Sequence, residues 1–240
     1  AYLSGYDFKE LVDRIVSLDN SEATLNLGLS ILSVKAKDSF TEKQSLYDLK
    51  SPFKVSHILD CGIFEALESL EEKYLDKAVA ALCIIMDETS QLGKVSKKEA
   101  YDYSDIFSFY DVDNLTLDLN KISESRTNKR DFLGFVAMLR KLIERIVDTH
   151  EKSRIKQVYK HVDKLPTSNF SWRFRLSILA LAPDHLREYV KNGLFKIFEM
   201  IDTYDIGGDF EYQNALINCF ECLNDADKNL YIEKLITNYK

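Results

Sequence analysis

Residues 169–200 read NFSWRFRLSILALAPDHLREYVKNGLFKIFEM, and this stretch shows the basic unit of the chain most clearly. Apolar residues recur every three or four positions on both sides of Pro183, which is the spacing of two amphipathic helices. Asn169 suits the cap of the first helix, and Pro183 suits the first turn of the second. Two helices joined by so short a turn are expected to pack antiparallel and to need neighbours that cover their remaining apolar faces.

The same periodicity runs through most of the remaining chain, so the sequence predicts an all-α fold. Ser21, Pro52 and Asp225 suit the starts of three further helices. Periodic apolar residues predict helices over 6–18, 21–32, 52–67, 75–89, 131–148, 152–164, 210–223 and 225–238.

One long segment, 91–128, interrupts this pattern. It contains YDYSDIFSFYDVDN, in which aromatic and acidic residues mix without a clear period. We therefore expect three parts within one continuous domain: helix pairs over 1–90, an irregular insertion or connection over 91–128, and helical repeats over 129–240.

The helix pairs begin at intervals that match a known class of repeat. Their starts lie near 7, 52, 129, 169 and 210, so most intervals are roughly 40–45 residues, and HEAT and armadillo repeats are about 40–47 residues long. The interval of about 77 residues is one repeat plus the insertion, or it contains a further repeat.

Two stretches carry a family resemblance. WRFRLSILALAPDHLREYV (172–190) and NALINCFECLNDADKNLYIEKLI (214–236) are similar to the solenoid tails of large bacterial multidomain proteins, including signal-transduction ATPases. Residues 129–240 resemble HEAT/armadillo-like repeats, which implies antiparallel helix pairs stacked as an irregular HEAT-like α-solenoid. The chain departs from the HEAT pattern because Asp184 with Arg187 is its one near match to the repeated Asp-then-Arg pair of the inter-helix turns.

Composition and length limit the other possibilities. The 240 residues are 45% hydrophobic, which allows a sizeable core. No run of eighteen apolar residues occurs and the start lacks the pattern of a secretory signal, so we expect no membrane association. Free cysteines fit a reducing, cytoplasmic location. The chain opens with Ala1 and not with an initiator methionine, so it is processed or is cut from something longer. Because nothing in it resembles a complete functional machine, we expect a piece of a larger intracellular protein.

No motif predicts catalysis, a cofactor or a metal site. Cys219 and Cys222 form a CxxC, but zinc would need two further ligands nearby, so burial in a helix is the preferred interpretation. Asp111, Asp113 and Asp118 resemble a calcium loop but lack its Gly and Glu positions. We therefore expect no enzyme activity and no cofactor.

Charge distribution gives the one candidate for a functional surface. The whole chain has a net charge of −7, yet residues 121–175 carry 14 basic and 6 acidic side chains. Four lysines in this region recur every fourth residue and so line one side of a helix. The candidate surface for an anionic partner contains Arg140, Arg145, Lys152, Arg154, Lys156, Lys160, Lys164, Arg173 and Arg175.

The same pattern allows simpler interpretations. Lysines opposite an apolar stripe also describe an ordinary solvated helix face. Trp172 and Phe174 could stack on nucleic-acid bases beside Arg173 and Arg175, although their helical spacing also fits a core.

These observations predict a non-enzymatic helical-repeat scaffold or interaction module that binds another macromolecule, with a protein as the preferred partner. One alternative is a HEAT-like nucleic-acid-binding protein that uses region 121–175, including an enzyme resembling the alkylpurine DNA glycosylases. Another alternative is a small helical immunity or inhibitor-type protein with one tight protein partner.

Overall fold

A computed structural model describes residues 5–34, 52–55, 57–92, 118–122, 131–166, 169–200 and 210–238. Over these ranges the chain is all helical, apart from turns and one isolated antiparallel bridge between Val34 and Phe53. The predicted all-α class is therefore confirmed. Most of the predicted insertion 91–128, and the predicted capping by the Asn169 side chain, lie outside what is described.

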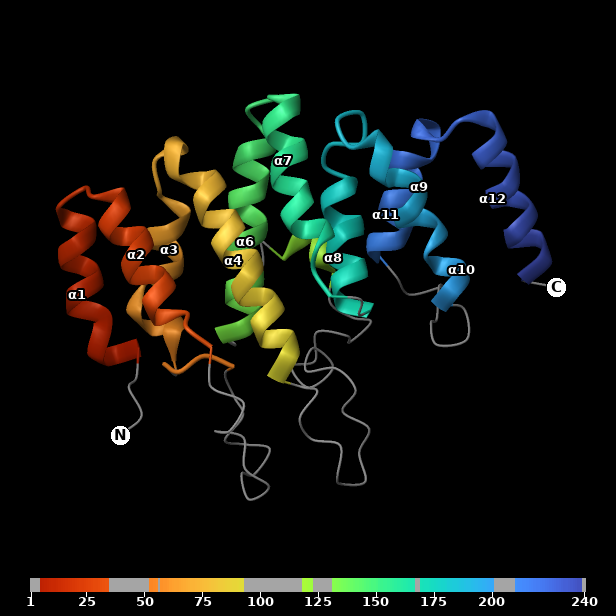
Figure 1. The fold of residues 1–240 in the computed structure, drawn as a ribbon. Helices are drawn as coiled ribbons and strands as arrows, with labels where there is room; N and C mark the ends of the chain where they lie inside the picture. Colours follow the sequence, from red (N-terminus) through yellow and green to blue (C-terminus); the bar gives the residue numbers. More distant parts are fainter. Residues whose placement is uncertain are drawn as a thin grey trace, which may run out of the picture.

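The helices stand side by side, largely in chain order, with α1 at one end of the row and α12 at the other; α11 departs from this order and lies beside α8 and α9 (Figure 1). The main packing contacts join elements that are consecutive or one to three places apart in the chain: α1 packs against α2 and η3, α3 against α6, α4 against α6 and α7, and α8 against α9 and α11. The elements are α1 Gly5–Ser17, α2 Ser21–Ile31, η3 Ile58–Cys61, α3 Ile63–Glu68, α4 Glu72–Leu92, η5 Leu119–Lys121, α6 Asp131–Val147, α7 Lys152–Asp163, α8 Asn169–Leu179, α9 Arg187–Phe195, α10 Ile197–Met200, α11 Phe210–Cys219, η8 Phe220–Cys222 and α12 Asp225–Asn238.

Three predicted helix starts are wrong in detail. The α2 cap is Asn20, whose side chain accepts a hydrogen bond from the Ala23 amide at 3.0 Å. Asn224 does the same for α12 by accepting from the Asp227 amide at 2.8 Å. Pro183 lies in the turn before α9, which begins four residues later at Arg187. For α2 and α12 the residue just before the helix supplies the cap, whereas Leu186, just before α9, makes no side-chain cap.

The predicted helix over 52–67, with Pro52 at its start, is also wrong: the helical residues begin at Ile58, and Gly62 divides them. Gly62 has φ +77°, a left-handed conformation that glycine adopts without steric cost. It ends η3 and begins α3, so two short helices replace one long helix. The aspartate that starts α6 holds the start of η3, since Asp131 accepts a hydrogen bond from the Ile58 amide at 2.8 Å.

A single hydrophobic cluster extends along the row, from Val12 in α1 to Tyr231 in α12. Aromatic rings connect its parts: centroids lie 5.5 Å apart for Phe53 and Phe135, and 6.0 Å apart for Phe132 and Phe170. The core therefore continues from the first helices into the C-terminal ones. None of the described helices is both long and apolar enough to cross a membrane.

Trp172 and Phe174 belong to this core, with exposed fractions of 2% and 0%. The Trp172 indole donates a hydrogen bond to the Gly193 carbonyl in α9 at 2.8 Å. A side chain at Gly193 would meet Leu179 at 2.6 Å, so glycine permits the close approach of α8 and α9. The suggested stacking of these rings on bases is therefore wrong, because they are covered by the protein itself.

Candidate functional site

The α7 helix, which carries the predicted lysines, has a buried apolar side and an exposed basic side. Ile155, Val158, Tyr159 and Val162 are buried against neighbouring helices. On the other side, Lys152, Lys160 and Lys164 are exposed and Lys156 is half-buried. We call these four lysines the lysine ridge. They lie on one face because four residues advance a helix by slightly more than one turn.

Glu188 of α9 faces the lysine ridge. The Lys156 ammonium lies 2.7 Å from a Glu188 carboxylate oxygen. This hydrogen bond, followed by the charges of Lys156, Lys160 and Lys152, lowers the pKa of the Glu188 carboxyl. One carboxylate thus lies near three ammonium groups, and the local charge stays positive.

Two of the predicted surface arginines lie inside the molecule. Arg140 is 2% exposed and Arg173 is 1% exposed. The Arg140 guanidinium donates to the backbone carbonyl and the hydroxyl of Ser177 in α8, at 3.0 and 2.9 Å. Arg173 forms an ion pair with the buried Glu211 of α11 at 2.7 Å. Their assignment to a partner-binding surface is therefore corrected: both connect helices within the chain.

Arg145 and Arg175 are engaged at the carboxyl ends of other helices. Arg145 in α6 donates to the carbonyls of Glu68 and Leu70, which lie at and after the end of α3, at 2.5 and 2.8 Å. Arg175 in α8 donates to the Asp163 carbonyl at the end of α7 at 3.0 Å, and to the Leu165 carbonyl. A guanidinium satisfies carbonyls that have no partner within their own helix, and its charge is favourable at the negative end of the helix dipole.

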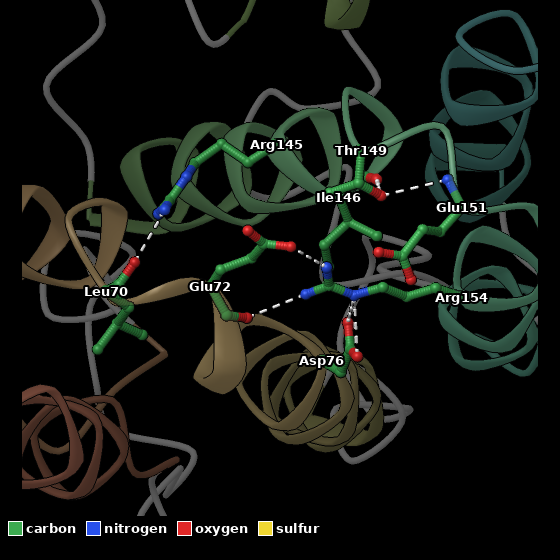
Figure 2. A network of polar contacts seen from close by, with 8 residues as sticks. All are labelled: Leu70, Glu72, Asp76, Arg145, Ile146, Thr149, Glu151 and Arg154. Atoms are coloured by element: carbon green, nitrogen blue, oxygen red, sulfur yellow. Dashed lines mark hydrogen bonds and ion pairs between the residues drawn. The ribbon is translucent and has the colours of Figure 1, made fainter.

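Arg154 joins α7 to α4, as Figure 2 shows. Its Nε lies 2.8 and 3.0 Å from the two carboxylate oxygens of Asp76. Its two terminal nitrogens reach the Glu72 carboxylate at 2.6 Å and the Glu72 carbonyl at 2.9 Å. Figure 2 also shows Arg145 reaching the Leu70 carbonyl from α6, so both arginines cross to the same preceding part of the chain.

The nine predicted residues therefore fall into two groups, the arginines and the lysines. All five arginines are bound to carbonyl or carboxylate groups of other parts of the chain, whereas three of the four lysines remain exposed. The rigid, planar guanidinium presents five donors and suits such buried or helix-end positions, whereas the lysine ammonium is more strongly hydrated. This difference between arginine and lysine is the signal by which the sequence could have separated the two groups.

The CxxC residues lie at a helix end. Cys219 is buried as the last residue of α11, and Cys222 is half-buried at the end of η8. Burial raises the pKa of the Cys219 thiol to about 12, which keeps it protonated and poorly reactive at neutral pH. Among the described residues, no group of three or more His, Cys, Asp or Glu side chains is placed to hold a metal ion.

The aspartates that resemble a calcium loop are only partly described. Asp111 and Asp113 lie outside the described residues. The Asp118 carboxylate accepts a hydrogen bond from the Asn120 amide at 2.9 Å and so caps η5. The structure therefore gives this carboxylate a capping role.

Comparisons with models of protein families, with curated proteins and with solved structures found no match. The candidate site is therefore defined by the contacts above. It is the lysine ridge of α7, with Glu188 beside it and the five arginines excluded from it.

Proposed function

We propose that the chain is a non-enzymatic helical-repeat module, an irregular HEAT-like α-solenoid, that binds a protein partner. The observation that carries this proposal is the row of helices whose main contacts join elements at most three places apart in the chain. In a repeat protein each unit buries its apolar faces against the units before and after it. Such a row leaves a long surface available for a macromolecular partner.

The arginine contacts support the same proposal. Arg154 joins α7 to α4, Arg140 joins α6 to α8, and Arg173 joins α8 to α11. Each contact crosses from one helix to an adjacent helix of the row. A stacked arrangement uses such links to fix the position of each unit on the preceding one.

The repeat proposal predicts that damage at one end of the row stays local. Leu25 in α2 is fully buried, so Leu25→Ala should leave a cavity and destabilise its surroundings by about 2–5 kcal/mol. Because nearest-neighbour interfaces dominate in repeat proteins, we expect faster amide hydrogen exchange in α1 to α4 and unchanged protection in α8 to α12. Hydrogen exchange read by mass spectrometry measures both regions in one experiment.

Leu11→Ala is the matched control, because Leu11 lies in α1 and is 44% exposed. It should alter exchange little anywhere. A uniform loss of protection along the whole chain in Leu25→Ala would contradict the repeat proposal, because it would indicate one globally cooperative body.

A nucleic-acid partner is the second candidate, and the lysine ridge is the observation that favours it. Successive lysines of the ridge are about 6 Å apart along the helix axis, so the ridge spans about 18 Å. An exposed positive face of this kind attracts phosphates electrostatically. The burial of Arg140 and Arg173 leaves fewer basic groups for this role than the charge count of region 121–175 predicts.

If nucleic acid is the partner, binding to duplex DNA should be salt-sensitive through the exposed lysines. Three neutralised phosphates correspond to a slope of about −2.7 in a plot of log affinity against log salt concentration. Reversing Lys152, Lys160 and Lys164 to Glu should abolish this binding. Fluorescence anisotropy with a labelled duplex at several salt concentrations measures both effects.

The matched control reverses three exposed lysines elsewhere, namely Lys9, Lys54 and Lys73. This variant has the same net charge but an intact lysine ridge. Equal losses in the two triple variants, or no salt-sensitive binding by the unmodified chain, would eliminate the nucleic-acid candidate.

A further inference from the structure

The segment Asp118–Ile122 lies against helices that come much later in the chain. Its short helix η5 contacts both α8 and α11. Leu119 is fully buried and Ile122 is 3% exposed. These five residues thus insert two apolar side chains between helices that come much later in the chain.

Polar groups of α11 recognise the backbone and the asparagine of this segment. The Glu211 carboxylate accepts a hydrogen bond from the Leu119 amide and also pairs with Arg173 at 2.7 Å. The Asn214 amide donates to the Asn120 side-chain oxygen at 3.1 Å. Asn218 donates to the Asn214 side-chain oxygen at 2.9 Å and thereby orients the Asn214 amide toward Asn120.

The segment also holds its own turn. The Asp118 carboxylate accepts from the Asn120 amide and from the Asn120 side chain, both at 2.9 Å. Contacts within the five residues therefore support the bound turn. A short peptide with the same residues has the contacts that are needed to form the same turn.

We propose that Glu211 and Asn214, with the surfaces of α8 and α11 around them, form a peptide-recognition site that residues 118–122 occupy in the free protein. The partner is a protein that carries a short segment of the same pattern: Asp, an apolar residue, Asn, any residue, then an apolar residue. Such a segment competes with the chain's own segment for the site. This inference rests on the proposed protein-binding function and names the surface and the chemistry of the partner.

The pattern follows from the contacts. The apolar second and fifth positions fill the places of Leu119 and Ile122, and the third position meets the amide of Asn214. The fourth position is open to any residue, because Lys121 is exposed and its ion pair, with Asp118 at 3.8 Å, lies within the segment itself. An attached segment competes at an effective concentration in the millimolar range, so a free peptide binds weakly until that segment is removed.

The test uses a variant in which residues 118–122 are replaced by Gly-Ser-Gly-Ser-Gly, and a labelled, end-blocked peptide Asp-Leu-Asn-Lys-Ile. We expect this emptied variant to bind the peptide at least tenfold more tightly than the unmodified chain. A peptide with Asp at its second position should not bind. Asn214→Ala in the emptied variant should reduce the affinity, because the asparagine contact is lost. Circular dichroism confirms that each variant is folded.

Leu119→Asp is a second way to empty the site, because a buried carboxylate opposite Glu211 disfavours the bound segment. If either emptied variant folds and ignores the peptide, the segment is only structural and the inference is overturned. If neither variant folds, the site cannot exist without its segment, and the inference is overturned as well. The hydrogen-exchange test of the repeat proposal does not depend on either result, so the two failures are distinguishable.

Discussion

Arg173→Met should lower the free energy of unfolding by about 3–5 kcal/mol, since it removes one partner of a buried ion pair. The Arg173 and Glu211 side chains are 1% and 0% exposed, and their charged atoms lie 2.7 Å apart. The variant leaves the Glu211 carboxylate buried, with the Leu119 amide as a remaining donor. A neutral donor does not replace the solvation that burial removes. Urea unfolding followed by circular dichroism measures the loss.

A double variant separates two contributions to stability: the cost of leaving the Glu211 charge buried without Arg173, and the gain from the ion pair itself. In Arg173→Met with Glu211→Gln no charge remains buried at this position, and the glutamine oxygen can still accept from the Leu119 amide. We expect at least half of the lost stability to return. The control Arg187→Met breaks the pair with Asp184, whose side chains are 63% and 80% exposed, and should change stability by less than about 1 kcal/mol. Equal effects of Arg173→Met and Arg187→Met would contradict the role of burial.

The helices with strong apolar faces could be predicted almost to the residue. The prediction for α6 was 131–148 against the observed Asp131–Val147, and for α7 it was 152–164 against Lys152–Asp163. Both helices bury a continuous stripe and present charged residues on the other side. Hydrophobic periodicity reports such a stripe directly, because it depends only on positions within the same helix.

Contacts between distant parts of the chain could not be predicted in this way. Ser21 has a residue type that favours a helix cap, but its hydroxyl instead accepts a hydrogen bond from the Glu71 amide, 50 residues away. Asp131 likewise binds the Ile58 amide across 73 residues. A serine or aspartate near a helix start satisfies either role, and only the arrangement of the helices decides between them.

The prediction of the candidate site was limited in the same way, because it could not include contacts between distant parts of the chain. A count of basic residues in 121–175 treats an arginine at a helix end like a lysine in solvent. Arg145 and Arg175 bind carbonyls at or after the ends of α3 and α7. Each carbonyl comes within reach of its arginine only when the helices pack together. The lysine ridge could be predicted as one face of a helix, because its four-residue spacing is a local property of that helix.

The aromatic residues of α8 give the second large effect. Phe174 is fully buried, and its ring stacks on Phe170 with centroids 6.1 Å apart. Phe170 in turn contacts Phe132 of α6, so these rings link two helices of the row. Phe174→Ala removes one ring from this packed series. We expect the free energy of unfolding to fall by about 3–5 kcal/mol, through lost burial and a residual cavity.

Phe210→Ala is the matched control, because it deletes the same side chain at a position that is 44% exposed, and it should cost less than about 1 kcal/mol. Urea unfolding and DNA binding are measured for both variants. Together they distinguish a Phe174 ring that packs in the core from one that stacks on bases. A core ring changes stability and leaves binding by the folded protein unaltered. A ring that stacks on bases is solvent-exposed before binding, so its removal costs little stability and weakens binding by about 1–3 kcal/mol. A small stability loss in Phe174→Ala would therefore contradict the burial of Phe174 in the core.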